Sequence, residues 1–419
     1  MEFLKIGDKI RYHRIQKGIT QEQLADGIIS KSYLSKIENN TAKPHRDVVN
    51  LLFKRLEIPS LEEDTQRIEE INRKMDEWYE VVKSRDKDNA IKMEKSISDD
   101  ISKIEDTTVF IRFRLFSLRH HLLLYNFDQS KKIIQELKAL KNHFSDQQKY
   151  YFYYFYGLYQ YLHNNFSESL DYYSKAEKIG YQIHIDEPEL TYLISLVHTR
   201  LNHVTLAIHY ANTALDLSNQ NIDYLRSVEA QSILAINYMR IKEYDKAKRH
   251  LEKSLKITEK HNDPYLISNI YHNLGYLYSK VDQHDLAIDY YHKSLNLKKG
   301  CHERITNTIY YLAESYYAVK NIEDATRWIK KGLKITEKYN IINNQIKLYL
   351  LQLEQNIDQE QSRKYIEETA IRYLQEKQNW KELSEAAEKL SNYYANQQSY
   401  KKAQDYCCLA NDARKNIQM

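Results

Sequence analysis

The sequence contains few of the residues that form turns. Among 419 residues there are only 8 Gly and 4 Pro. A β-rich protein of this length would need many more, because tight turns depend on these residues. The composition therefore predicts an all-α protein whose helices are joined by short polar turns. No apolar run approaches the roughly 18 residues of a membrane helix, and the N-terminus lacks the apolar run of a signal peptide. We therefore expect a cytoplasmic protein without a membrane partner.

Cysteine is scarce as well. The three cysteines, Cys301, Cys407 and Cys408, do not have the spacing of a disulfide framework or a zinc site. The histidines show no metal-ligand pattern. Nucleotide-binding, metalloprotease and hydrolase motifs, such as G-x-x-x-x-G-K-[ST], H-E-x-x-H and G-x-S-x-G, are absent. We therefore expect no metal, no cofactor and no enzymatic activity, and a reducing cytoplasm as the compartment.

The net charge is small but unevenly distributed. Residues 1–58 hold 11 Lys and Arg against 7 Asp and Glu, so they account for the whole net charge of +4. A surplus of this size is only a weak indication of nucleic-acid binding until a motif supports it.

Residues 1–60 show the signals of a small helical domain. One helix is expected from near Gly7 to before Gly18. Thr20 and Gln23 have the spacing of a capping box at the start of a second helix. Ser30 is expected to cap a third helix over 31–38. A fourth helix is predicted over 44–56, with its apolar residues packed beneath the others: Val48, Leu51, Leu52 and Leu56. Together these signals predict four to five helices.

Two stretches in this domain, Thr20-Gln21-Glu22-Gln23-Leu24-Ala25 and Ser32-Tyr33-Leu34-Ser35-Lys36-Ile37-Glu38, resemble the lambda-repressor-like (XRE) helix-turn-helix family. The turn over 26–29 is one residue shorter than the family usually has. The resemblance implies that the third helix enters the major groove of a DNA operator. The expected base contacts are Lys31, Ser32, Tyr33 and Lys36, and the expected phosphate contacts are Arg11, Arg14, Gln21, Asn40 and Lys43. The alternative is that these charges form an ordinary solvated face.

The rest of the chain is organised around the stretch 269–297. Its Gly275, Ala287, Tyr291 and Ser294 match the tetratricopeptide pattern of small and aromatic residues. Nine units over 73–419 recur at spacings of 37 to 41 residues, after a linking helix expected over 61–72. The first residue of each unit and its partner twelve residues later are Trp78/Ala90, Leu118/Ser130, Gly157/Ser169, Ser195/Ala207, Ala235/Ala247, Gly275/Ala287, Ala313/Ala325, Leu350/Ser362 and Ser391/Ala403. We expect stacked helical hairpins in a right-handed superhelix with a concave inner surface.

The first helix of each hairpin is expected to line that surface with amides, tyrosines and charges of both signs. An Asn side chain offers one acceptor and two donors, so it can pair with both groups of a peptide backbone. This mixture suits an extended peptide better than an apolar metabolite. For any single residue the alternative is a solvated helix face, and most of the 37 tyrosines are expected to fill the repeat interior.

A helix-turn-helix followed by such repeats resembles the Rap, NprR, PlcR and PrgX group of peptide-sensing regulators, with length and repeat number most similar to the NprR branch. The resemblance implies a transcription regulator of quorum sensing that binds a short secreted and re-imported peptide. The peptide would change the oligomeric state of a homodimer or higher homo-oligomer, and with it operator binding. The residues whose types match the group's peptide clamp are Arg119, Arg200, Asn237, Asn269, Asn273, Tyr276, Asn307, Tyr310 and Glu314.

Two other functions stay open from the sequence. One is a Rap-like protein that binds or inhibits a phosphorelay response regulator in the peptide-free state. Residues 61–145 would serve this role, with polar side chains such as Glu69, Glu70 and Gln129. The other is a phage-type repressor that uses its repeats only for oligomerisation.

Overall fold

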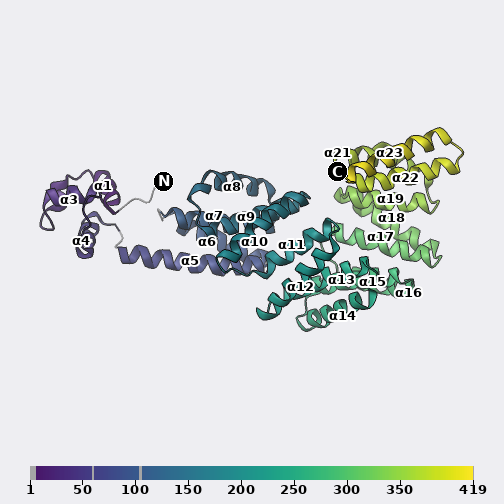
Figure 1. The fold of residues 1–419 in the computed structure, drawn as a ribbon, viewed down its shortest axis with the longest axis horizontal. Helices are drawn as coiled ribbons and strands as arrows, with labels where there is room; N and C mark the ends of the chain where they lie inside the picture. Colours follow the sequence, from purple (N-terminus) through teal and green to yellow (C-terminus); the bar gives the residue numbers. More distant parts are fainter. Residues whose placement is uncertain (1–5, 59–60, 103–105, 419) are drawn as a thin grey trace. The chain divides into compact units, whose positions relative to one another are not determined.

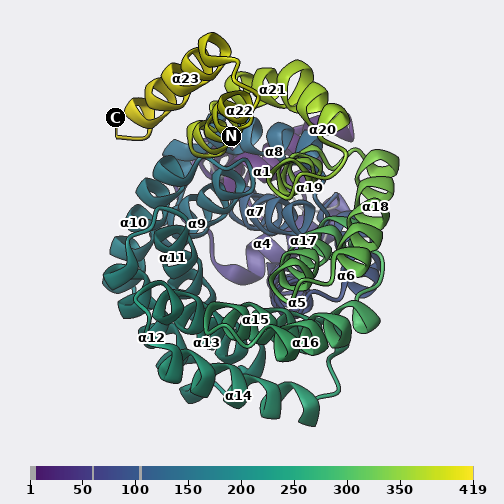
Figure 2. The same ribbon diagram turned by 90° about the vertical axis from the view of Figure 1, so that its right-hand side faces the viewer.

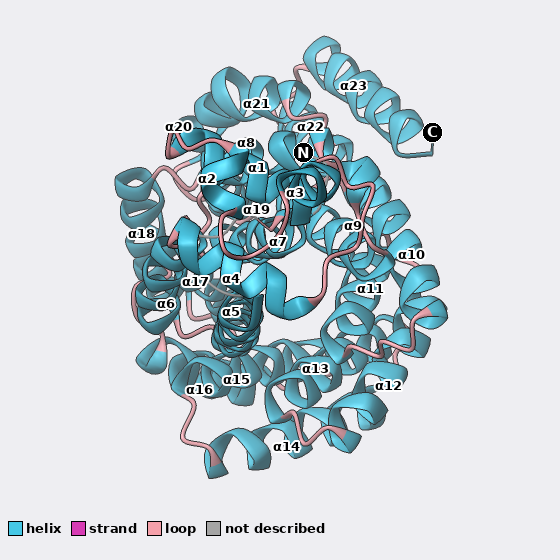
Figure 3. Ribbon diagram, turned by 90° about the vertical axis from the view of Figure 1, so that its left-hand side faces the viewer, coloured by secondary structure: helices cyan, strands magenta, loops and turns pink. Residues whose placement is uncertain are grey.

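The computed structural model describes residues 6–58, 61–102 and 106–418. All regular secondary structure in these ranges is helical, as expected (Figure 3). The chain divides into two compact units, Met1–Leu201 and Asn202–Met419, which are described separately below. None of the helices in the described ranges is long and apolar enough to cross a membrane.

Four helices form the helix-turn-helix domain: α1 (Ile6–Gln16), α2 (Gln21–Ala25), α3 (Lys31–Glu38) and α4 (Arg46–Leu56) (Figure 1). The predicted capping box is confirmed, since Thr20 Oγ1 accepts from the backbone N–H of Gln23 and the Gln23 side chain accepts from the backbone N–H of Thr20. Ser30 caps α3 by accepting from the backbone N–H of Tyr33. The expected boundary at residue 60 lies outside the described residues.

Helices α1 and α3 of this domain pack so closely that the residue at the contact, Gly7, has to be glycine. A Cβ atom on Gly7 would lie 1.9 Å from the carbonyl oxygen of Ile37. The expectation for Leu51 was wrong, because its side chain is 50% exposed. Helix α4 instead buries positions that follow the i, i+3, i+4, i+7 pattern of one helix face: Val49, Leu52, Phe53 and Leu56.

The first unit continues with helical hairpins. Their helices are α5 (Leu61–Lys83), α6 (Lys87–Ile101), α7 (Thr107–Leu123), α8 (Phe127–Ala139), the short 3₁₀ helix η1 (Lys141–His143), α9 (Asp146–Leu162), α10 (Phe166–Gln182) and α11 (Pro188–Arg200). Helices α5 and α6, α7 and α8, and α9 and α10 pack as pairs. Helix α5 runs without a break through the expected division between a linking helix over 61–72 and repeats from 73.

The second unit begins with α12 (Val204–Gln220), and five further hairpins follow in its described residues. Their helices are α13 (Tyr224–Arg240) and α14 (Tyr244–Lys260), α15 (Pro264–Lys280) and α16 (His284–Leu297), α17 (His302–Ala318) and α18 (Ile322–Tyr339), α19 (Ile342–Glu354) with α20 (Gln359–Tyr365), the π segment η2 (Ile366–Ala370) and α21 (Ile371–Glu376), and α22 (Trp380–Asn396) with α23 (Tyr400–Gln418). Figure 2 shows α13 to α16 side by side.

The twelve-residue pairing predicted from the sequence corresponds to direct contacts inside hairpins. Ser169 Oγ donates to the Gly157 carbonyl at 2.8 Å, and Trp78 Nε1 donates to the Ala90 carbonyl at 3.0 Å. In the hairpin of α15 and α16, a Cβ atom on Gly275 would lie 2.6 Å from the Tyr291 ring. The small residue is therefore needed because the aromatic ring of the second helix lies directly against the backbone of the first.

Candidate functional site

Helix α3 presents the predicted base-contacting residues on the exposed side of the helix-turn-helix domain. Lys31, Ser32 and Lys36 are exposed and Tyr33 is half-buried. Lys31 Nζ lies 3.2 Å from Glu22 Oε2, and the Ser32 hydroxyl lies 3.1 Å from that of Ser30. Within the described residues, the Lys36 side chain has no hydrogen-bond or ion-pair partner. This amine is therefore free to donate to an acceptor outside the chain.

Among the predicted phosphate contacts, Arg14 has a structural partner instead. Its Nε lies 2.6 Å from Glu38 Oε1, and its Nη2 donates to Glu38 Oε2 at 2.9 Å. Gln21 Nε2 donates to the same Glu38 oxygen at 2.7 Å. Because the Glu38 side chain is only 1% exposed, both side chains are needed to satisfy its carboxylate. Arg14 and Gln21 therefore have a structural role in the domain, and their contacts with phosphates stay a prediction.

The other three expected phosphate contacts, Arg11, Asn40 and Lys43, stay predictions as well. Arg11 and Lys43 are exposed, and Asn40 is half-buried at the end of α3 with φ of 56°. Tyr33 links this end to the following loop, since its hydroxyl donates to the Lys43 carbonyl at 3.5 Å. Within the described residues neither Arg11 nor Lys43 has an ion-pair partner, so both cations can contact phosphates.

Six of the nine predicted peptide-binding residues lie on two neighbouring helices of the second unit. Asn269, Asn273 and Tyr276 occupy positions i, i+4 and i+7 of α15, and thus one face of that helix. The equivalent face of α17 carries three more: Asn307, Tyr310 and Glu314. Helices α15 and α17 are in contact, so the structure brings these two faces together.

The asparagines differ in how far they are free to bind a ligand. Asn273 and Asn307 are half-buried, and within the described residues neither forms a side-chain hydrogen bond. Asn269 Oδ1 accepts from the Arg304 guanidinium. Asn237 of α13 is fully buried and donates to the Ile233 carbonyl at 2.9 Å. Asn273 and Asn307 are therefore the amides best placed to pair with a peptide backbone.

Aromatic rings and a carboxylate complete this surface. Tyr311, which the sequence did not single out, lies between Tyr276 and Tyr310, with ring centroids 5.2 and 5.0 Å away. Glu314 lies one turn beyond Tyr310 on α17, and burial raises the pKa of its carboxyl, an effect that the charge of Lys280 opposes. The face thus combines unpaired amides, half-buried tyrosines and one desolvated carboxylate.

The two remaining predicted residues belong to the first unit. Arg119 of α7 is buried, and its Nη2 lies 2.8 Å from Glu189 Oε1. The other Glu189 oxygen accepts from the Tyr154 hydroxyl at 2.5 Å. Arg200, at the end of α11, is exposed and its Nε donates to the Tyr161 hydroxyl at 3.3 Å. Since the guanidinium of Arg119 is held by a buried carboxylate, its described contacts stabilise the first unit.

The structure also shows a cluster of polar groups that the sequence reasoning missed. Lys298, in the loop after α16, donates to the hydroxyl of Thr308 and to the carbonyl oxygen of Arg304. The Thr308 hydroxyl also lies 3.0 Å from His272 Nδ1. The repeat register predicts that the residues six and three positions before Gly275, which are Asn269 and His272, face inward. Lys298 and Arg304 lie outside that pattern, because one is in a loop and the other precedes the marked stripe of α17.

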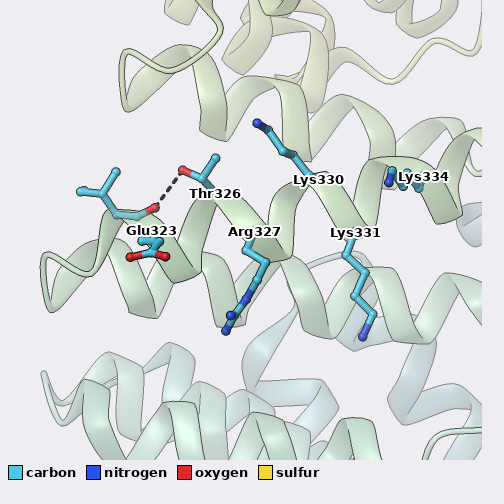
Figure 4. A pocket seen from close by; sticks show the side chains of 7 residues that line it. Glu323, Thr326, Arg327, Lys330, Lys331 and Lys334 are labelled. Carbon is cyan, nitrogen blue, oxygen red and sulfur yellow. Dashed lines mark hydrogen bonds between the residues drawn. The ribbon is translucent and has the colours of Figure 1, made fainter.

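A separate basic surface lies on α18. Figure 4 shows a hollow lined by Glu323, Thr326, Arg327, Lys330, Lys331 and Lys334. In it Thr326 Oγ1 donates to the Ile322 carbonyl at 2.8 Å, as helix residues commonly do. The predicted peptide-binding residues take no part in this hollow. In the described ranges no group of three or more His, Cys, Asp or Glu side chains has the geometry to hold a metal ion.

Comparison with known families divides the chain into three matched parts. A helix-turn-helix family matches residues 10–62. The family described as response regulator aspartate phosphatase H, N terminal, matches residues 65–125. Tetratricopeptide repeats match residues 228–261 and 268–301. The second tetratricopeptide match contains Gly275, on which the sequence register was built.

Several known proteins match most of the chain. The transcriptional activator NprA of Geobacillus stearothermophilus is 31% identical over 405 residues, which covers 94% of this chain and 99% of NprA. The regulatory protein RapD of Bacillus subtilis is 25% identical, and the match covers 78% of this chain and 94% of RapD. Among solved structures, the apo quorum sensor NprR from B. thuringiensis has a TM-score of 0.70 at 22% identity and covers 83% of this chain and 99% of that one. A second NprR structure, in complex with its cognate peptide NprX, has a TM-score of 0.64 at 22% identity, covering 83% and 98%. At this identity the solved structures establish the fold alone.

Proposed function

We propose that this protein, which belongs to the Rap, NprR, PlcR and PrgX group of regulators, is a transcription regulator whose repeats bind a short signalling peptide and thereby control DNA binding. Membership of the group rests on the whole-length match to NprA. The observation that carries the proposal is one face of α15 and α17, where Asn273 and Asn307 lie on the same helices as Tyr276 and Tyr310 and form no side-chain hydrogen bond within the described residues.

Peptide recognition follows from the chemistry of that face. Each free amide can donate to a peptide carbonyl and accept from a peptide N–H, which binds the main chain whatever its side chains are. Tyrosine adds a large contact area and fixes few rotatable bonds on binding. The solved NprR complex contains a cognate peptide, and this supports the choice of ligand class.

DNA binding is assigned to α3 and its surroundings. Lys36 and Ser32 are exposed at positions from which a recognition helix reaches base edges, and Arg11 and Lys43 would contact phosphates. We propose that a homo-oligomer binds paired half-sites in the cytoplasm. Peptide binding to the repeats would change that oligomer, because a ligand at 100 times its dissociation constant favours its preferred conformer by about 2.7 kcal/mol.

The experiment that tests the proposal is a thermal-shift measurement on the full chain. The protein is mixed with small molecules extracted from spent medium of the native host, before and after protease treatment. A stabilisation that disappears after protease treatment is expected. The absence of any shift in both samples would contradict a peptide ligand.

A second candidate function rests on residues 65–125, which match the N-terminal family of a response regulator aspartate phosphatase. This region includes Glu69 and Glu70 on α5, which are accessible in the structure. We propose it as a surface for a phosphorelay response regulator in the peptide-free state. Co-elution of a response regulator with the protein only in the absence of peptide would support this activity, and no co-elution in either state would exclude it.

A further inference from the structure

Lys298 occupies an unusual place because the helix before it is short. Helix α16 has 14 residues, whereas α12 and α14 each have 17. The chain leaves the helix at Leu297, and the side chain of Lys298 then turns to α17. There its Nζ donates to the hydroxyl of the fully buried Thr308 and, at 3.3 Å, to the carbonyl oxygen of Arg304.

Arg304 brings a second cation to the same place. It lies one helical turn before Thr308 on α17, and its guanidinium donates to Asn269 Oδ1 of α15. The same guanidinium lies over the ring of Tyr265, 4.0 Å from its centroid. Arg304, Lys298 and Asn269 are each half-buried, and Tyr265 is 52% exposed. The cluster therefore reaches the surface on the face that holds the free amides.

The positive charge of this cluster is not balanced by a carboxylate in the described part of the chain. Neither Lys298 nor Arg304 forms an ion pair with a carboxylate of the described residues. Burial and the charge of Arg304 lower the pKa of Lys298 to about 7. Burial and both cations lower the pKa of His272 to about 3, so this ring is neutral. Two desolvated cations without a counter-ion are unfavourable, and a bound anion would relieve that cost.

We propose that Lys298 and Arg304 bind a carboxylate of the peptide ligand, so that the peptide-binding face has a dedicated anion site at the start of α17. This inference rests on the proposed peptide-binding function. A carboxylate is the matching anion because every unmodified peptide has one at its C-terminus, and Asp or Glu can supply another. The planar guanidinium of Arg304 can hold both oxygens while Lys298 acts as a compact charge beside them.

The site lies at a distance from Glu314 that suits a short peptide. Ten residues separate Arg304 from Glu314 along α17, which is about 15 Å at 1.5 Å per residue. An extended peptide covers that distance with about five residues, at roughly 3.3 Å each. The face therefore has cations at one end and a carboxylate at the other, with Asn273 and Asn307 between them.

The test uses immobilised full-length protein and synthetic heptapeptide pools. One pool has random sequences with free C-terminal carboxylates, a second has amidated C-termini, and a third lacks Asp and Glu. A fourth is both amidated and free of Asp and Glu. Wild-type protein is expected to retain peptides from the first pool and at least tenfold less from the fourth. The second and third pools show whether the C-terminus or a side chain supplies the carboxylate.

Variants then connect the effect to this cluster. Lys298→Gln and Arg304→Gln are expected to reduce retention from the carboxylate-containing pools at least tenfold, whereas Lys299→Gln, an exposed neighbour with the same charge change, should behave as wild type. Equal retention of all four pools by wild-type protein, or wild-type retention by Lys298→Gln, would overturn the anion site and leave the proposed function intact. Retention of no peptide from any pool would overturn both. The pool comparison on wild-type protein does not depend on whether a variant folds.

Discussion

Arg14 of α1 and Glu38 of α3 form a two-point ion pair in which the carboxylate is buried, with contacts of 2.6 and 2.9 Å. The two residues are 24 positions apart, so the pair ties the first helix to the end of the helix that is expected to read DNA. Gln21 of α2 donates to the same carboxylate and adds the second helix to this arrangement.

Removing one partner of this pair should loosen the domain. Arg14→Ala leaves Glu38 buried with one hydrogen bond, and breaking a buried pair in this way costs about 3 kcal/mol. Hydrogen exchange in the full chain should show that the protection of α3 amides falls by roughly a hundredfold. Arg11→Ala, which removes an exposed cation from the same helix, is the control. Unchanged protection in Arg14→Ala would show that the ion pair does not hold α3.

The two classes of expected DNA contact should respond differently to substitution. Lys36→Gln is expected to weaken binding to a selected duplex more than binding to random DNA, by about 1–3 kcal/mol, since it removes a base contact. Arg11→Gln should weaken both equally and lower the slope of log affinity against log salt by about 1. Fluorescence anisotropy at several salt concentrations measures both effects. Lys54→Gln, an exposed cation on α4, is the matched control, and an equal loss in that variant would contradict the assignment to α3.

Because Gly275 lies against the Tyr291 ring, the effect of Gly275→Ala on stability should depend on whether that ring is present. Gly275→Ala alone places a methyl group against the Tyr291 ring, and overpacking of this kind costs about 1–3 kcal/mol. In a Tyr291→Leu background the ring is gone, so the same change should be neutral or stabilising, because Ala favours a helix over Gly by about 1 kcal/mol. Thermal denaturation of the four proteins measures this coupling. Equal effects of Gly275→Ala in both backgrounds would contradict the packing described.

Lys298 should give the second unit a distinct dependence on pH. Its pKa is about 7 in the folded protein against an ordinary value of 10.5, because of burial and Arg304, while Cys301 acts weakly in the opposite direction. Between these values the unfolded chain binds more protons, so the stability contributed by this residue rises with pH from about 7 to 10.5. Neighbouring His272 stays neutral throughout that range.

A variant without the titrating amine tests this dependence. Lys298→Met should have a higher denaturation midpoint than wild type at pH 7, and the difference should shrink as the pH is raised towards 10. Lys299→Met, which changes an exposed amine, should follow wild type at every pH. A difference between Lys298→Met and wild type that stays constant from pH 7 to pH 10 would contradict the lowered pKa.

The sequence was most informative where a local rule determines the structure. The capping box of Thr20 and Gln23 depends on residues three apart, and the contact of Gly275 with Tyr291 follows from a repeated pattern of small and aromatic residues. Leu51 was placed wrongly in the core because its apolar neighbours allow two helix faces, and only packing against α1 to α3 selects the one that contains Val49 and Phe53.

The candidate sites were predicted less completely, for a physical reason. The pattern of the repeats marks positions on the first helix of each hairpin, and Asn307 is one of them. Asn273 lies beside the marked positions and was named because its residue type matches the peptide clamp of the family that the chain resembles. The pattern could not find Lys298, whose side chain reaches Thr308 because α16 ends early, nor the pairing of Arg14 with Glu38. The first depends on where α16 ends, and the second on packing between residues 24 positions apart, so neither follows from a local rule. The right-handed superhelix stays a prediction.

The central claim is that a peptide bound to the repeats controls DNA binding, and it is tested most directly by titrating a selected duplex with the full chain at zero and saturating peptide. The peptide fraction is the one that stabilises the protein and is destroyed by protease. The account predicts that the apparent dissociation constant for the duplex changes at least fivefold, as coupling of about 1 kcal/mol requires, and that Asn273→Ala abolishes the change. Identical titration curves with and without saturating peptide would contradict it.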